Sequence, residues 1–92
     1  MEIVWSRSKN RRLKATRGVC FEDVVPILLE RGYIVVLENP SHPGQMVYVL
    51  RYRNFTYVIP FEVAGETIIL KTVFPSRKFH KLYGEKKGEG ET

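Results

Sequence analysis

The sequence has a single cysteine and no long hydrophobic run, and each absence narrows the class of protein. Cys20 alone cannot form an internal disulfide or build a zinc site, which favours a reducing compartment. No apolar segment approaches the roughly 20 residues that a membrane-spanning helix needs. The N-terminal segment MEIVWSRSK lacks the charged-then-apolar order of a signal peptide. We therefore expect a cytoplasmic protein.

The sequence also lacks the motifs of several enzyme classes. It contains no glycine-rich phosphate loop, no paired carboxylates at a catalytic spacing and no residues at metal-ligand spacing. A cysteine nucleophile would need a histidine partner, which the sequence does not identify, so we interpret Cys20 as a small buried residue. These absences argue against nucleotide hydrolysis and metal catalysis, and we expect no cofactor.

What the sequence does contain is positive charge and enough apolar residues for one core. Its 92 residues are 43% hydrophobic and 12% aromatic, which indicates a single domain over residues 1–84. Fifteen Lys and Arg against ten Asp and Glu give a net charge of +5, which is typical of proteins that meet phosphate or an acidic partner. Residues 85–92 are polar and glycine-rich, and we expect a flexible tail there.

Hydrophobic periodicity predicts two helices in the first third of the chain. Residues 7–17, RSKNRRLKATR, carry six basic residues and no acid, and they precede Gly18 at the position of a helix C-terminal glycine. Leu13 is the large apolar residue with which this helix can pack. Residues 20–32 have helical spacing of apolar residues, although Pro26 predicts a kink or a late start.

β-branched and aromatic residues predict four strands after the helices. The strands cover residues 33–39, 46–52, 55–61 and 67–74, and the short links between them favour antiparallel pairing. Ser76 can then cap a last short helix. The sequence therefore predicts an α+β fold in which two N-terminal helices pack on an antiparallel sheet of about four strands, followed by a short C-terminal helix.

Polar residues inside the predicted strands suggest a second, uncovered face of the sheet. Arg51 and Lys71 stand in otherwise apolar strands, so both could point away from the helices and contact phosphate. The alternative is that each lies at a strand edge and discourages aggregation. Tyr48, Tyr52 and Tyr57 could stack on unpaired bases, but strand tyrosines are more often half-buried, and we favour the core for them.

The C-terminal stretch PSRKFHKLY contains the strongest candidate site. Arg77 has a planar fork that can grip phosphate oxygens, and Lys78 and Lys81 add positive charge beside it. His80 stands one helical turn from Arg77, and histidine can act as an acid or a base near neutral pH. Tyr83 is a second candidate for proton transfer. The alternative is a solvated helix whose charges serve only solubility.

Several segments of the chain occur in the order and spacing of a known family. They are Trp5, KN at 9–10, RGVCFEDVV at 17–25, VIPF at 58–61 and LKTVFPSRK at 70–78. Together they resemble the BrnT-like toxins of bacterial type II toxin–antitoxin systems, which belong to the RelE-like superfamily. The resemblance implies a small basic toxin that cleaves RNA and is neutralised by an acidic cognate antitoxin, often a ribbon-helix-helix protein. Cys20 stands where that family usually has a serine, so the second helix should have a weaker N-cap.

The residues and the resemblance together predict a metal-independent endoribonuclease that inhibits translation. In this hypothesis Arg77 stabilises the transition state, and His80 or Tyr83 transfers a proton. The residues that would contact RNA, free or ribosome-bound, are Arg51, Lys71, Lys78 and Lys81. Two alternatives stay open at this point: a ParE-like toxin that poisons DNA gyrase, and a non-catalytic module that binds RNA or a partner protein.

Overall fold

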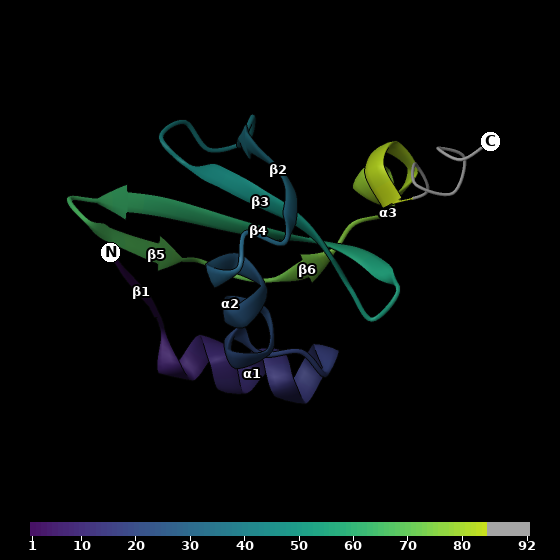
Figure 1. Ribbon diagram of the computed structural model, residues 1–92. Coiled ribbons are helices and arrows are strands. Elements are labelled where there is room, and N and C mark those ends of the chain that lie inside the picture. The colour runs from purple at the N-terminus through teal and green to yellow at the C-terminus, as the bar shows by residue number, and fades with distance from the viewer. Residues whose placement is uncertain (85–92) are drawn as a thin grey trace.

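A computed structural model describes residues 1–84 as an α+β fold (Figure 1). The elements in chain order are β1 (Glu2–Trp5), α1 (Arg7–Arg17), α2 (Phe21–Leu29), β2 (Tyr33–Glu38), β3 (Met46–Tyr52), β4 (Phe55–Ala64), β5 (Thr67–Leu70), β6 (Phe74–Pro75), α3 (Arg77–Phe79) and the π-helical turn η1 (His80–Gly84). The predicted N-terminal helices and short C-terminal helix are confirmed. The tail predicted over residues 85–92 lies outside the described residues. None of the helices within residues 1–84 is long and apolar enough to span a membrane.

The prediction of an antiparallel sheet of about four strands is only partly correct: the predicted strands pair antiparallel, but the added strand β1 makes the sheet mixed. The strand order is β1-β5-β4-β3-β2, with β6 paired to β4 as well. β1 runs parallel to β5, with Val4 opposite Ile69, and the other pairs are antiparallel. The segment EIVW is too short to reveal its alternation, and its partner lies more than sixty positions later in the chain. Pairing over that separation leaves no local signal in the sequence.

The strand predicted over residues 67–74 is interrupted in the structure. β5 ends at Leu70, opposite Phe61 of β4, and β6 begins at Phe74, opposite Val58. Residues 71–73 therefore lie opposite only residues 59–60, so this strand has one extra residue. The carbonyl of Pro60, in β4, accepts a hydrogen bond from the N–H of Lys71 at 2.8 Å. Proline has no N–H with which to return that bond, so the ladder breaks opposite it.

The helices α1 and α2 pack on one face of the sheet and form the main core with it (Figure 1). α2 begins at Phe21 and contains Pro26, so the late start considered for this helix does not occur. Tyr48, Tyr52 and Tyr57 pack against the same core, as expected. Burial raises the pKa of the Tyr48 and Tyr52 phenols. The fully or nearly fully buried members of the core are Leu13, Val19, Phe21, Val24, Leu28, Leu50, Ile59, Phe61, Ile68, Leu70 and Val73.

A buried asparagine joins the two N-terminal helices. Cys20 is the N-cap residue of α2 and makes no side-chain capping bond, in keeping with the weaker cap expected of a cysteine at this position. Instead Asn10 of α1 accepts a hydrogen bond from the Phe21 N–H at 2.7 Å and donates one to Glu22 Oε1 at 2.8 Å. The α2 N-terminus is therefore capped by a residue of the other helix. Burial and the neighbouring carboxylates raise the pKa of the Cys20 thiol, in keeping with an inert buried residue.

The opposite face of the sheet is only partly covered. Val47, Val49 and Val58 form a second apolar cluster there, and Phe79 and Tyr83 of the C-terminal helix pack on it. Side chains alternate along a strand, so Arg51 shares this face with Val47 and Val49. The open part of this face and the C-terminal helix that borders it contain the residues of the candidate site.

Candidate functional site

Ser76 fixes the start of the C-terminal helix. Its Oγ accepts a hydrogen bond from the Phe79 N–H at 3.1 Å, and its own N–H donates to the Thr56 carbonyl at 3.0 Å. The predicted N-cap is therefore confirmed, and it also ties the helix to β4. The following residues, Arg77 and Lys78, lie exposed in the first turn.

The imidazole of His80 is oriented by two neighbours. Thr56 Oγ1 lies 2.8 Å from His80 Nδ1, and the imidazole stacks on the Phe55 ring with centroids 4.2 Å apart and an interplanar angle of 17°. Thr56 is fully buried. A hydroxyl can donate to or accept from a ring nitrogen, so this contact suits either tautomer. His80 itself is only partly buried.

The turn η1 closes tightly around this imidazole. A Cβ atom on Gly84 would collide with the His80 ring and would lie 2.7 Å from Thr56 Oγ1, so the backbone approaches as only glycine permits. The Gly84 carbonyl accepts a hydrogen bond from Arg51 Nη1 at 2.7 Å. π-helical turns are frequent at functional sites, and this one places the histidine against the sheet.

Cations surround the exposed side of His80. Arg77, Lys78, His80 and Lys81 line one open cavity of about 700 Å³ together with Phe55. Among the described residues, its lining includes no carboxylate. Three cations beside an open hollow create a positive potential that favours an anionic ligand. We call this hollow the His80 cavity.

The other predicted site residues lie elsewhere. Tyr83 stacks with Phe79, with ring centroids 6.0 Å apart, and packs on the valine cluster of the sheet, so we assign it to packing. Arg51 binds the Gly84 carbonyl and anchors the helix from the sheet. Lys71 lies 3.9 Å from Glu62, and both side chains are about two-fifths exposed. These three residues do not line the His80 cavity.

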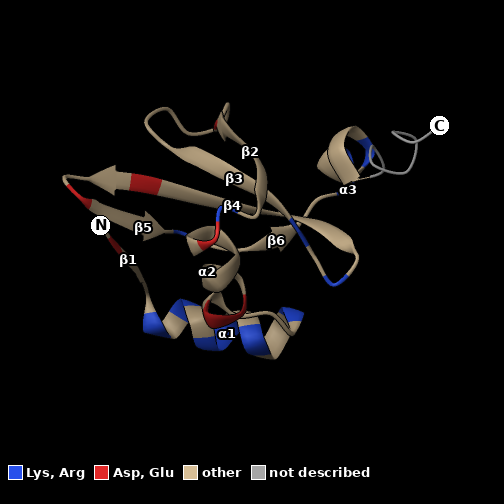
Figure 2. Ribbon diagram, viewed as in Figure 1, with Lys and Arg blue, Asp and Glu red and all other residues tan. Residues whose placement is uncertain are grey.

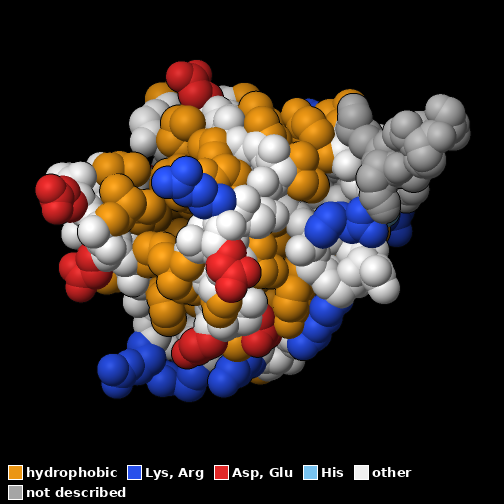
Figure 3. All heavy atoms as spheres, in the orientation of Figure 1, with side chains coloured by type: hydrophobic (Ala, Val, Ile, Leu, Met, Phe, Trp, Pro, Cys, Tyr) orange, Lys and Arg blue, Asp and Glu red, His pale blue; other side chains and the backbone are white. Residues whose placement is uncertain are grey.

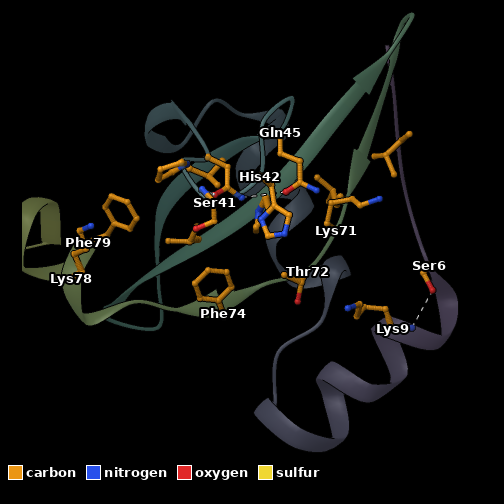
Figure 4. Close-up of a pocket in the computed structure, with 17 residues that line it drawn as sticks. Ser6, Lys9, Ser41, His42, Gln45, Lys71, Thr72, Phe74, Lys78 and Phe79 are labelled. Atoms are coloured by element: carbon orange, nitrogen blue, oxygen red, sulfur yellow. Dashed lines mark hydrogen bonds between the residues drawn. The ribbon is translucent and has the colours of Figure 1, made fainter.

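A second hollow lies on the uncovered face of the sheet, and we call it the open-face groove (Figure 4). Its volume is about 650 Å³. Phe74, Phe79 and aliphatic strand residues form its apolar surface, and Lys71 and Lys78 lie among its polar groups. Lys78 lines both this groove and the His80 cavity.

The cations of α1 form a separate basic edge. Figure 2 shows Lys and Arg along the whole helix, and Figure 3 shows them gathered along the surface of that edge. Most of these side chains are exposed, whereas Leu13 faces the core. The basic helix predicted from the sequence is therefore confirmed, and most of its charge projects away from the two hollows.

Sequence reasoning missed the residues that position His80. In the strand FTYVIPF, alternation places the Thr56 side chain on the same face as Val58 and Pro60. This alternation is a sequence signal that could have identified Thr56. Phe55 and Gly84 gave no such signal, because their roles depend on contacts with a histidine distant in the sequence or one helical turn away.

The chain matches no protein-family model, and a search of curated proteins found no match either. The resemblance to BrnT-like toxins therefore stays a prediction. Within residues 1–84, no three His, Cys, Asp or Glu side chains lie close enough together to hold a metal ion.

Proposed function

We propose that the protein is an endoribonuclease, the toxin of a type II toxin–antitoxin system, which cleaves RNA and thereby inhibits translation. The observation that supports this most is the His80 cavity. It combines an imidazole oriented by Thr56 and Phe55 with the side chains of Arg77, Lys78 and Lys81. An oriented proton-transfer group beside several phosphate-binding cations is what RNA cleavage requires.

The chemistry proceeds by attack of a ribose 2′-oxygen on the adjacent phosphorus. The 2′-OH loses its proton, a new bond forms between the 2′-oxygen and phosphorus, and the bond from phosphorus to the 5′-oxygen breaks. The leaving 5′-oxygen takes up a proton, so the products are a 2′,3′-cyclic phosphate and a 5′-hydroxyl. His80 is the group in this cavity that can transfer one of these protons, and water can transfer the other.

The cations stabilise the charge that develops on phosphate oxygens. The guanidinium of Arg77 can bind two of these oxygens at once, whereas Lys78 and Lys81 act as point charges. This assigns Arg77 to the transition state and the two lysines to holding the strand.

A cognate acidic antitoxin, of the ribbon-helix-helix kind that the resemblance implies, completes the proposal. The basic edge of α1 supports it, since six cations without an acid offer a large complementary surface. The net charge of +5 also favours the binding of an acidic partner.

The test is a comparison of cleavage and binding in two variants of Arg77. Because its interaction strengthens only in the transition state, we expect Arg77→Ala to lower single-turnover cleavage by about 100-fold, as loss of an oxyanion donor does, with a much smaller loss of affinity. Arg77→Lys keeps the charge and loses the fork, so it should restore binding but not cleavage.

Lys14→Ala, on the outer edge of α1, is the control, and its cleavage should fall no further than its affinity. An Arg77→Ala protein that cuts RNA as fast as the parent would refute the assignment. RNA binding without cleavage by the parent would instead favour the non-catalytic module, and loss of gyrase supercoiling in a parallel assay would favour the ParE-like alternative.

A further inference from the structure

The open-face groove combines aromatic rings with an aliphatic surface. Phe74 precedes the C-terminal helix and Phe79 lies within it, and both rings are partly buried at the groove (Figure 4). Val58, Pro60 and Ile69 supply apolar surface from β4 and β5. A flat apolar ligand can therefore lie on this surface and against a ring without losing hydrogen bonds to water.

Three lysines from different parts of the chain surround this apolar surface. Lys9 comes from α1, Lys71 follows β5, and Lys78 comes from α3. Among the described residues, the lining of the groove itself includes no carboxylate, although Glu62 borders it, 3.9 Å from Lys71 and hydrogen-bonded to the groove residue Gln45. The ligand that fits best is therefore apolar in its centre and anionic at its margins.

Lys78 connects this groove to the His80 cavity. It lines both hollows, and its ammonium lies 5.8 Å from the centroid of the Phe79 ring. Because Lys78 lines both hollows, an extended strand with one phosphate in the His80 cavity can continue past this lysine toward the open-face groove. The same lysine would then contact a phosphate beside a stacked base.

The geometry points to the open-face groove as a nucleobase-binding subsite, in which a base of the RNA substrate stacks on Phe74 or Phe79 while flanking phosphates contact Lys71 and Lys78. Aromatic rings interleaved with cations are the usual means by which proteins hold unpaired nucleotides. This inference rests on the proposed function for its substrate. An acidic protein segment could also pair with these lysines, but its binding would not require aromatic rings next to the reacting phosphate.

The test uses RNA that cannot be cut. A fluorescent 2′-O-methyl oligonucleotide lacks the attacking hydroxyl, and an abasic residue placed at each position in turn removes one base at a time. We expect one abasic position to weaken binding to the parent by about 10-fold, the scale of one lost base–aromatic stack.

Leucine variants distinguish stacking from apolar contact. Phe74→Leu or Phe79→Leu keeps apolar bulk and loses the aromatic face, so one of these variants should bind the intact oligonucleotide about 10-fold more weakly than the parent does. That variant should bind the abasic oligonucleotide no more weakly than the intact one, because the stacked base is already without its partner. The tyrosine variant at the same position should restore binding. Val63→Ala, at an exposed apolar residue of β4, is the control and should bind as the parent does. Thermal unfolding checks that each variant is folded.

The outcomes separate this inference from the proposed function. If the parent cuts ordinary RNA, yet no abasic position and no ring variant changes binding, the subsite is refuted and the groove is free for a protein partner. If the parent cuts no RNA, but binding depends on one base and one ring, the proposed cleavage fails and the subsite stands. Equal binding of folded leucine and tyrosine variants would also refute the subsite, since the aromatic face would then contribute nothing.

Discussion

At the scale of single residues, Thr56 links the sheet to the proposed proton-transfer group, His80. Its fully buried hydroxyl lies 2.8 Å from His80 Nδ1, so it orients the imidazole without lining the His80 cavity. A residue of this kind is a positioning residue, and its removal should affect the rate of reaction more than the affinity for RNA.

Thr56→Val tests this role, because valine has nearly the shape of threonine and lacks the hydroxyl. We expect single-turnover cleavage to fall about 10-fold with the RNA dissociation constant unchanged, as a displaced catalytic group predicts. Thr56→Ser keeps the hydroxyl and should restore most of the rate. If the valine variant cleaved RNA as fast as the parent, Thr56 would not be a positioning residue for the reaction.

Asn10 is a buried polar residue whose hydrogen bonds contribute to the stability of the fold. Asn10→Ala leaves the Phe21 N–H without its acceptor and removes the bond to Glu22. We expect the free energy of unfolding to fall by about 1–3 kcal/mol, measured by urea denaturation at neutral pH. Thr16→Ala is the control on an exposed part of α1 and should change the free energy by less than about 0.5 kcal/mol.

The same variant has a defined pH dependence. The bond from Asn10 is the main cause that lowers the pKa of Glu22 below its ordinary value of 4.5. A carboxyl whose pKa is lowered by folding contributes stability above that ordinary value and loses it as pH falls through the folded pKa. The difference in unfolding free energy between the parent and Asn10→Ala should therefore narrow below pH 4.5. A difference that stays constant across that range would show that Glu22 is not coupled to Asn10.

At the scale of elements, the C-terminal helix is attached to the sheet by apolar packing and by hydrogen bonds. Phe79 and Tyr83 pack on the valine cluster, and Arg51 binds the Gly84 carbonyl. Because His80 lies between these contacts, the orientation of the imidazole depends on the docking of the whole segment.

Arg51→Gln tests that dependence. Loss of the bond to Gly84 should speed amide hydrogen exchange in residues 80–84 and lower cleavage several-fold, about what loss of one charged hydrogen bond of roughly 1.5 kcal/mol or more would cause. Arg53→Gln is a matched control, since Arg53 also donates to a backbone carbonyl, that of Gly18 at 3.0 Å. If Arg53→Gln loosened residues 80–84 as much as Arg51→Gln, the bond to Gly84 would not be the cause.

Local patterns made most of these elements predictable. The helix cap at Ser76 is predictable because its signal lies within three residues, and helical spacing predicts that Arg77, His80 and Lys81 share a face, with Lys78 next to Arg77 in the sequence. The parallel pairing of β1 and the break opposite Pro60 depend on partners elsewhere in the chain. Strand alternation places Thr56 on the open face, but its contact with His80, 24 positions later, depends in the same way on a distant partner.

At the scale of the whole molecule, two groups of cations stand out. Most of those of α1 lie along one edge, on the helix-covered side of the sheet (Figure 2), although Lys9 lines the open-face groove. Those of the C-terminal helix line the His80 cavity. This separation would allow an acidic partner to bind the edge while RNA occupies the cavity and the open-face groove. In the proposed function, the phosphorus–oxygen bond of the RNA breaks in the His80 cavity.

The most direct test is therefore to analyse the ends of RNA incubated with the purified protein. We predict fragments that end in a 2′,3′-cyclic phosphate or its 3′-phosphate hydrolysis product and begin with a 5′-hydroxyl, formed equally well with EDTA present, because the reaction as derived uses only side chains and water. His80→Gln, purified in the same way to control for contaminating nucleases, should form them at least about 100-fold more slowly, the scale for loss of a general acid or base. Intact RNA with the parent, or the same fragments at the same rate with His80→Gln, would contradict the account.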